Sequence, residues 1–180
     1  MSNIQGKFPS TRLRRNRMRE FSRRLIAENN LSSNDLILPL FVCEGNNVED
    51  PIQSMPGVSR YSIDKLLKKV EDAVRLSIPA IAIFPQIDTN LKNAEGSLAV
   101  DENNLVCRSI KSIKKEFSEI GIICDVALDP FTNHGHDGLV IDNKIDNDKT
   151  LEILEKQALV QVSAGCDVIA PSDMMDGRVG

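Results

Sequence analysis

The sequence contains no apolar run of the roughly 20 residues that a membrane-spanning helix requires. It also lacks an apolar secretory signal, since it begins Met-Ser-Asn-Ile-Gln-Gly. We therefore expect a cytoplasmic protein without a membrane partner. The 180 residues are 41% hydrophobic and 27% charged, which suits a soluble globular domain with a sizeable core.

Cysteines are few and widely separated. The four of them form no CxxC pair, and their spacing fits neither a zinc ribbon nor a dense disulfide framework. Cys43, Cys124 and Cys166 lie in or beside apolar runs. We interpret these three as small buried hydrophobic side chains.

Two nucleotide-binding motifs are also missing, because no GxGxxG follows the first apolar run and no GxxxxGK[ST] occurs. The net charge of −4 and the lack of an aromatic ladder argue against nucleic-acid binding. The charge is uneven, however, since seven arginines lie between Arg12 and Arg24. We expect this basic arm to be solvated or to contact a neighbouring subunit.

What the sequence does contain is a repeated pattern of short apolar runs separated by helical periodicity. Runs that are continuous and rich in Val and Ile are typical of strands buried on both faces. The four runs are 36–43, 80–84, 121–128 and 166–170. Between them, apolar stripes predict a helix capped by Ser62 (Ile63, Leu66, Leu67, Val70, Ala73, Val74), a second (Val106, Ile110, Ile113, Phe117) and a third from Asp148 to Gly165 (Leu151, Leu154, Ala158, Val162). Residues 11–29 also have helical character.

Strands alternating with helices predict right-handed βαβ units and a parallel sheet. Four units fit either an open doubly wound sheet or half of an eight-unit barrel. A barrel takes about 250 residues. This sequence ends where a fourth helix should begin, so we expect it to be truncated.

Ligands of such folds bind at the carboxyl ends of the strands, and each apolar run here is followed by a carboxylate. We interpret Glu44 and Asp88 as helix-capping residues of βα loops. Asp125 differs because it lies inside an apolar run, where a carboxylate needs a partner or its pKa rises. Asp125 is therefore our first candidate for a functional residue.

Asp129 and Asp137 flank a loop that holds both histidines, His134 and His136. Two carboxylates and two imidazoles could bind a metal ion, with carboxylates favouring Mg²⁺ and imidazoles favouring zinc or iron. The alternative, which we favour, is that the histidines fix the loop by hydrogen bonds. Ser172 follows a strand without a GxSxG motif, so we expect it to donate hydrogen bonds and not to act as a nucleophile.

Lysine is absent from every predicted strand exit. The lysines lie on predicted helices, at their starts, or in loops away from the strands. If the reaction needs an imine, these 180 residues do not supply its nucleophile.

Five segments together resemble one enzyme family. They are Phe8–Arg17, Asp35–Val42, Ser54–Gly57, Asp125–Gly138 and Ala170–Val179, the last reading APSDMMDGRV. In this order, and over nearly the whole chain, they resemble the porphobilinogen synthases, also called delta-aminolevulinic acid dehydratases. The last two segments are long and specific.

The resemblance implies an α/β fold of the (β/α)₈ TIM-barrel type. Residues 1–34 would form a partly helical arm that contacts a neighbouring subunit in a homo-oligomer of up to eight chains. Residues 35–180 would form the first half of the barrel, about four βα units. The implied activity is that of a hydro-lyase, which condenses two 5-aminolevulinate molecules to porphobilinogen with loss of two waters, in tetrapyrrole (haem) biosynthesis.

The same resemblance assigns roles residue by residue. Asp125 and Ser172 match the active-site aspartate and serine of the family. Zinc-using members carry three cysteines at positions that are Ala127, Asp129 and Asp137 here, which implies a zinc-independent, aspartate-rich type. We therefore take Asp125, Ser172, Asp129 and Asp137 as catalytic candidates. No metal ligand is assigned firmly, with Asp129 and Asp137 as the possible ones and no catalytic zinc expected.

The resemblance also implies parts that these residues lack. The activating Mg²⁺ would be bound by residues outside this chain, as would the two Schiff-base lysines and the arginines that hold the substrate carboxylate. We therefore expect the chain to be inactive alone. One alternative is a non-catalytic half-barrel fragment with only an assembly or binding role. A weaker one is a different, lysine-free barrel such as a Mg²⁺-dependent lyase.

Overall fold

The structure is a computed structural model that describes residues 6–180. The chain divides into two compact units, the first ending at Ser32 and the second running from Ser33 to Gly180. The first unit contains a short 3₁₀ helix, Arg15–Arg17, and the helix α1, Glu20–Leu25. No residue from 6 to 32 is buried. Helix therefore forms in only part of the predicted 11–29 segment.

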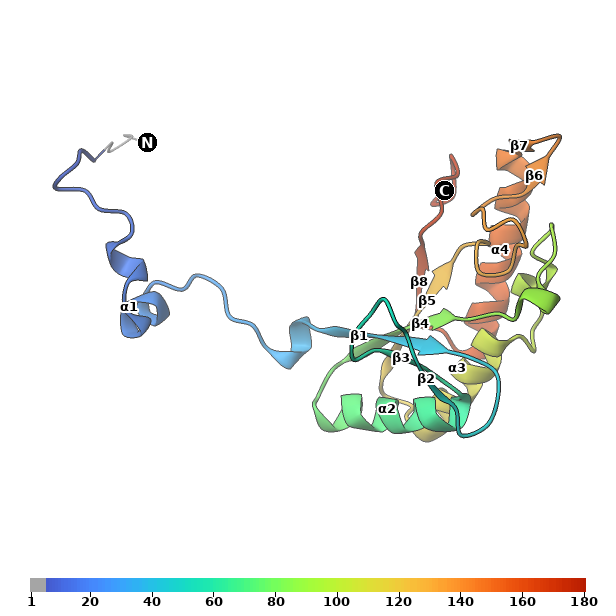
Figure 1. The fold of residues 1–180 in the computed structure, drawn as a ribbon, viewed down its shortest axis with the longest axis horizontal. Coiled ribbons are helices and arrows are strands. Elements are labelled where there is room, and N and C mark those ends of the chain that lie inside the picture. The colour runs from blue at the N-terminus through green and yellow to red at the C-terminus, as the bar shows by residue number, and fades with distance from the viewer. Residues whose placement is uncertain (1–5) are drawn as a thin grey trace. The chain divides into compact units, whose positions relative to one another are not determined.

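The second unit is built on a sheet of six strands in the order β2-β3-β1-β4-β5-β8 (Figure 1). Four of its parallel strands, from β1 to the edge strand β8, correspond to the four apolar runs. They are β1 (Ile37–Val42), β4 (Ala80–Pro85), β5 (Gly121–Val126) and β8 (Val168–Pro171). The remaining strands are short, and the sequence pattern did not predict them: β2 (Glu49–Pro51), β3 (Ser59–Tyr61), β6 (Val140–Ile141) and β7 (Lys144–Ile145).

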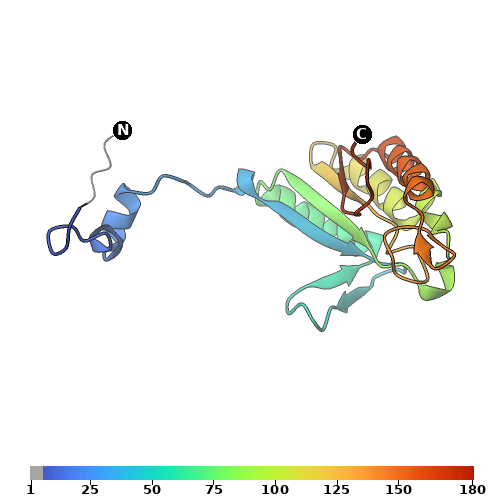
Figure 2. The same cartoon turned by 90° about the horizontal axis from the view of Figure 1, so that it is seen from above.

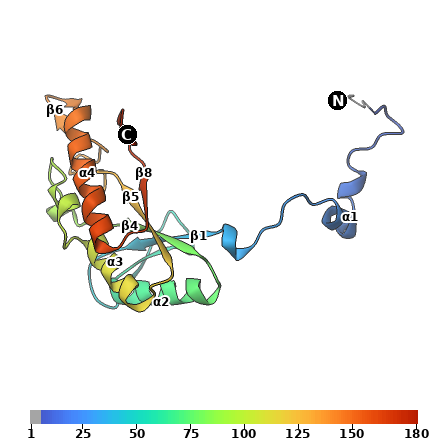
Figure 3. The same ribbon diagram turned by 180° about the vertical axis from the view of Figure 1, so that it is seen from behind.

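Three helices cover one face of this sheet, as Figures 2 and 3 show from two directions. They are α2 (Ile63–Arg75), α3 (Leu105–Glu116) and α4 (Asn147–Ala164). Asn104 and Asp146 cap α3 and α4 by accepting backbone N–H bonds, and Gly165 ends α4 with a left-handed φ of 112°. Ser62 precedes α2 but forms no capping bond, because its hydroxyl accepts from Val48 N and donates to Asp64.

Burial alternates along β1, β4 and β5, but not along the edge strand β8, which is largely exposed. Every second side chain is buried beneath the helices: Leu40, Val42, Ile81, Ile83, Ile122, Cys124 and Val126. The residues between them are only partly buried, and Phe41 and Phe84 stack on the other face with ring centroids 5.6 Å apart. The prediction of strands buried on both faces is therefore wrong within the second unit, residues 33–180, because no element of that unit covers the second face. Asp125 lies on this open face.

The buried face of α4 also differs from the predicted stripe. Val162 is 49% exposed, whereas Gln157 and Gln161 are each 1% exposed. The helix forms as predicted, but the face that it buries against the sheet includes Gln157 and Gln161 and excludes Val162. Those amides donate to backbone carbonyls at the end of β5 and just after it, on Asp125 and Ala127. A buried amide with a partner is stable in a core, so the apolar stripe alone misplaced the face.

The cysteine prediction is confirmed, since Cys43, Cys124 and Cys166 are buried and free, as is Cys107. Among the described helices, none is both long and apolar enough to cross a membrane.

Candidate active site

The exits of β5 and β8 bring two of the predicted site residues together. These strands are parallel neighbours, with Asp125 in register with Ala170. The hydroxyl of Ser172, two residues farther along, donates to Asp125 Oδ1 at 2.6 Å. The expectation that Ser172 donates a hydrogen bond is therefore met, and its acceptor is the first candidate carboxylate.

The pKa of Asp125 is raised above its ordinary value. Burial is the largest cause, because it disfavours the charged form, and the charges of Asp137 and Asp173 add to it. The hydrogen bond from Ser172 opposes the shift without cancelling it. A carboxyl group held in this way can exchange a proton nearer to neutral pH than an exposed aspartate can, which suits general acid–base catalysis.

Asp129 and Asp137 lie on the loop that follows β5, as predicted. The pKa of Asp129 is raised, first by partial desolvation and then by the charges of Asp137 and Asp125. Since the carboxylate of Asp129 is exposed, we give more weight to these two charges than to desolvation. The three carboxylates thus form one electrostatic cluster at the strand exit.

The loop is held by hydrogen bonds that involve one of the histidines. His134 Nδ1 accepts from His136 N at 3.1 Å, which leaves Nε2 to donate to the Ala94 carbonyl at 3.3 Å. Thr132 Oγ1 donates to the His136 carbonyl at 3.0 Å. The interpretation that histidine fixes this loop therefore holds for His134. Both of its ring nitrogens are occupied, so it offers none to a metal ion.

Metal binding has no support in the arrangement of side chains. Among residues 6–180, no three His, Cys, Asp or Glu side chains gather closely enough to hold an ion. Lys92 makes only a small opposing contribution to the raised pKa of Asp129. The sequence pattern predicted that Lys92 lies away from the strands. It does not predict the path of the loop that follows β4.

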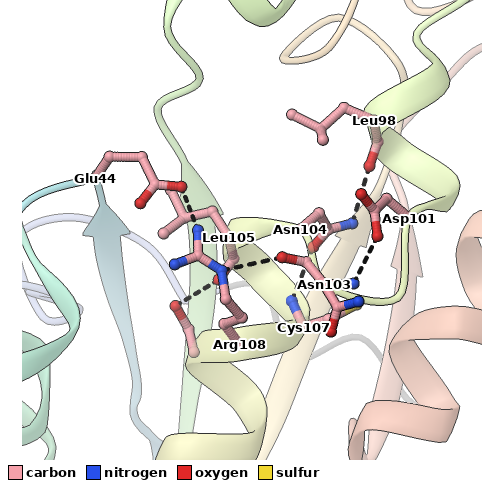
Figure 4. Close-up of polar contacts among 9 residues, drawn as sticks. Glu44, Leu98, Asp101, Asn103, Asn104, Leu105, Cys107 and Arg108 are labelled. Carbon is pink, nitrogen blue, oxygen red and sulfur yellow. Dashed lines mark hydrogen bonds and ion pairs between the residues drawn. The ribbon is translucent and has the colours of Figure 1, made fainter.

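The carboxylates after β4 and β1 make structural contacts, one as a cap and the other in an ion pair. Asp88 accepts from Asn90 N at 3.0 Å and so caps a short turn, as predicted. Glu44 does not cap a helix. It forms an ion pair with Arg108 of α3, and Arg108 Nε also donates to the Asn103 carbonyl at 3.0 Å (Figure 4). These contacts tie the end of β1 to the start of α3.

Replacing Asp125 with asparagine should stabilise the fold at neutral pH. A raised carboxyl pKa means that the folded protein binds more protons than the unfolded chain between the ordinary value of 3.8 and the raised value. Stability therefore falls as the pH rises through that window. Asparagine does not ionise and so avoids this loss. The urea midpoint of Asp125→Asn should therefore be higher than that of the parent at pH 7.5, and the two midpoints should converge toward about pH 4.

The control is Asp72→Asn on the exposed surface of α2, which removes a negative charge without touching the site. A variant Asp125→Asn that is less stable than its parent at pH 7.5 would show that ionised Asp125 is favourably paired.

A parallel α/β sheet with acidic side chains gathered at its strand exits defines the class of α/β enzymes that bind ligands at that edge. The comparisons with known proteins narrow the class to one family. The family model described as "Delta-aminolevulinic acid dehydratase" matches residues 10–180. The chain belongs to the delta-aminolevulinic acid dehydratase family.

Its relatives include dehydratases of distant organisms. The chain is 58% identical to the delta-aminolevulinic acid dehydratase of Bradyrhizobium diazoefficiens over 93% of its own length and 48% of the relative's. It is 45% identical to that of Chlamydia pneumoniae, over 95% and 52% of the two lengths. The chain thus spans about half the length of these curated relatives.

A solved structure agrees with the fold. It is the crystal structure of delta-aminolevulinic acid dehydratase (porphobilinogen synthase) from Toxoplasma gondii in complex with its reaction product, porphobilinogen. The TM-score is 0.88 at 43% identity, over 94% of this chain and 48% of the other. The parallel α/β fold described above therefore corresponds to half the length of that enzyme.

Proposed function

We propose that this chain supplies the first half of a porphobilinogen synthase, which condenses two molecules of 5-aminolevulinate to one porphobilinogen and two waters. The observation that carries the proposal is the Ser172–Asp125 pair, which joins two of the family's sequence motifs at adjacent strand exits. Family membership supports the reaction, and the Ser172–Asp125 geometry supports a part for these residues in it.

In this reaction Asp125 is the proton-transferring group. Its raised pKa suits it to hold or accept a proton near neutral pH, and Ser172 fixes the orientation of its carboxyl group. Asp129 and Asp137 orient amine and water groups and stabilise the positive charge of iminium intermediates. The Schiff-base lysines come from residues beyond these 180, in the second half of a (β/α)₈ barrel.

The proposed enzyme is of the zinc-independent type. The positions that hold zinc-binding cysteines in other members are Ala127, Asp129 and Asp137. Carboxylate oxygens are poor substitutes for the thiolates that zinc prefers. The activating Mg²⁺ would be bound by residues outside this chain. It would stabilise charge in the enzyme without taking a ligand from the Asp125 site.

The basic arm is the proposed contact between subunits of a homo-oligomer. None of the described residues up to Ser32 is buried, and apolar side chains are exposed beside the arginines. Leu13 is 86% exposed and Leu25 is 80% exposed. Apolar side chains that a unit cannot bury itself are typical of surfaces covered on assembly. We place the assembled enzyme in the cytoplasm.

The test is porphobilinogen formation from 5-aminolevulinate, with and without Mg²⁺. The full-length protein should form product, and the 180-residue chain alone should form none because it has no imine-forming lysine at the site. Product from the chain alone would overturn the lysine argument. Absence of product from the full-length protein under both conditions would contradict the proposed function and favour an assembly role.

A further inference from the structure

Two buried glutamines of α4 hold the backbone at the exit of β5. Gln161 Nε2 donates to the Asp125 carbonyl at 2.9 Å, and Gln157 Nε2 donates to the Ala127 carbonyl at 3.1 Å. Both side chains are 1% exposed. They are four residues apart and so lie on the same face of the helix. Together they bracket the segment that begins at the candidate catalytic carboxylate.

The Asp125 carbonyl needs this partner because the sheet cannot supply one. Gly121 N donates to the Pro79 carbonyl, and the alternation of a parallel ladder then places the Asp125 carbonyl opposite the nitrogen of residue 85. Residue 85 is a proline and has no N–H. The β4–β5 ladder accordingly ends at the pair Ile83–Cys124.

The orientation of the two amides is fixed by what they bind. A carbonyl accepts only from the NH₂ group, so each Oε1 is turned away, and neither Oε1 has a hydrogen-bond partner among the described residues. An unpaired buried acceptor lowers stability. An apolar residue at Gln161 would avoid that loss but would leave the Asp125 carbonyl unpaired.

We propose that Gln161, supported by Gln157, is a positioning residue for Asp125. By occupying the carbonyl that Pro85 leaves without a partner, Gln161 fixes the backbone from which the Asp125 side chain projects. This keeps the carboxyl group within 2.6 Å of the Ser172 hydroxyl. Gln161 touches no reacting atom, and its effect on turnover passes through Asp125. The inference rests on the proposed function.

The experiment is Gln161→Met in the full-length protein, which keeps the length of the side chain and removes the donor. We expect kcat per folded protein to fall about tenfold, because a small displacement of a proton-transfer group is costly, with KM changed less than about twofold. Ser109→Ala is the control, since it removes a buried hydrogen bond within α3 and leaves β5 untouched.

A second readout does not depend on turnover. Amide hydrogen exchange of peptides covering residues 122–128 should accelerate about tenfold in Gln161→Met, while peptides covering 37–42 stay unchanged. A merely structural role would lower the folded fraction and accelerate exchange across the whole sheet. If Gln161→Met does not fold, Gln161→Asn serves instead, because it keeps the amide but is one methylene too short to reach.

Coupling to Ser172 completes the test. In the double variant with Ser172→Ala, the losses of kcat should be less than multiplicative, because both substitutions release the same carboxyl group. Unchanged kcat together with unchanged exchange at 122–128 would overturn the inference. If the parent protein forms no porphobilinogen, the proposed function fails, whereas the exchange comparison still decides whether Gln161 holds β5.

Discussion

Replacing Asp125 with alanine in the full-length protein is expected to lower kcat by at least about a hundredfold. The substitution removes the carboxyl group whose pKa is raised by burial and by its acidic neighbours. It also leaves the Ser172 hydroxyl without its acceptor at 2.6 Å. The proposed role in proton transfer requires the loss to fall mainly on kcat and only weakly on KM.

The measurement is the steady-state rate of porphobilinogen formation at saturating 5-aminolevulinate. Asp72→Ala is the matched control, since it removes an aspartate paired with Arg75 on the surface of α2. We expect that control to retain nearly all activity. Turnover by Asp125→Ala within a few-fold of the parent would end the proton-transfer role and leave Asp125 as a hydrogen-bond acceptor only.

Replacing Phe131 with alanine should cost about 3–5 kcal/mol of unfolding free energy. Phe131 is 2% exposed and is among the largest fully buried side chains described. It lies in the turn that follows β5, where its N–H donates to the Leu128 carbonyl at 2.9 Å. Gly96 packs against this turn, since a Cβ atom added to it would lie 3.7 Å from Phe131 Cβ.

Urea unfolding followed by circular dichroism measures this cost. Leu76→Ala is the control, because Leu76 is 62% exposed and its truncation should change stability by less than about 0.5 kcal/mol. Phe131→Leu should lose less than Phe131→Ala, since it leaves a smaller cavity. A loss below about 1 kcal/mol for Phe131→Ala would mean that the turn collapses around the gap.

The sequence predicted the central strands and the helices between them because each carries a strong local signal. The strands at 37–42, 80–85 and 121–126 are continuous apolar runs, and Gly165 marks a helix end by chemistry that needs no tertiary context. The caps Asn104 and Asp146 were not predicted. The short strands β2, β3, β6 and β7 have neither length nor apolar alternation. Strand β3 forms by pairing with β1, which lies well before it in the sequence. Strands β6 and β7 form a tight hairpin around Asp142 and Asn143, both with positive φ, and the apolar pattern does not register that local turn.

The candidate site was predicted in part for the same reason. Asp125 stands out because a carboxylate inside an apolar run is unusual, and the pairing with Ser172 follows from the parallel order of β5 and β8. The contact made by Gln161 was missed. Gln161 carried a faint signal, as a polar residue four positions from Gln157, but its partner is a carbonyl that only the strand register identifies.

The seven arginines of the basic arm leave the chain electrically divided. Residues 1–32 hold eight of the 22 basic residues and two of the 26 acidic ones, so they carry +6 and the remaining residues carry −10. Opposite charges on two parts of one chain attract between copies as well as within one. The screening length is about 10 Å at 0.1 M salt and about 3 Å at 1 M. The proposed association between copies through the arm should therefore weaken as ionic strength rises, which would make the size of the particle in solution a function of the buffer.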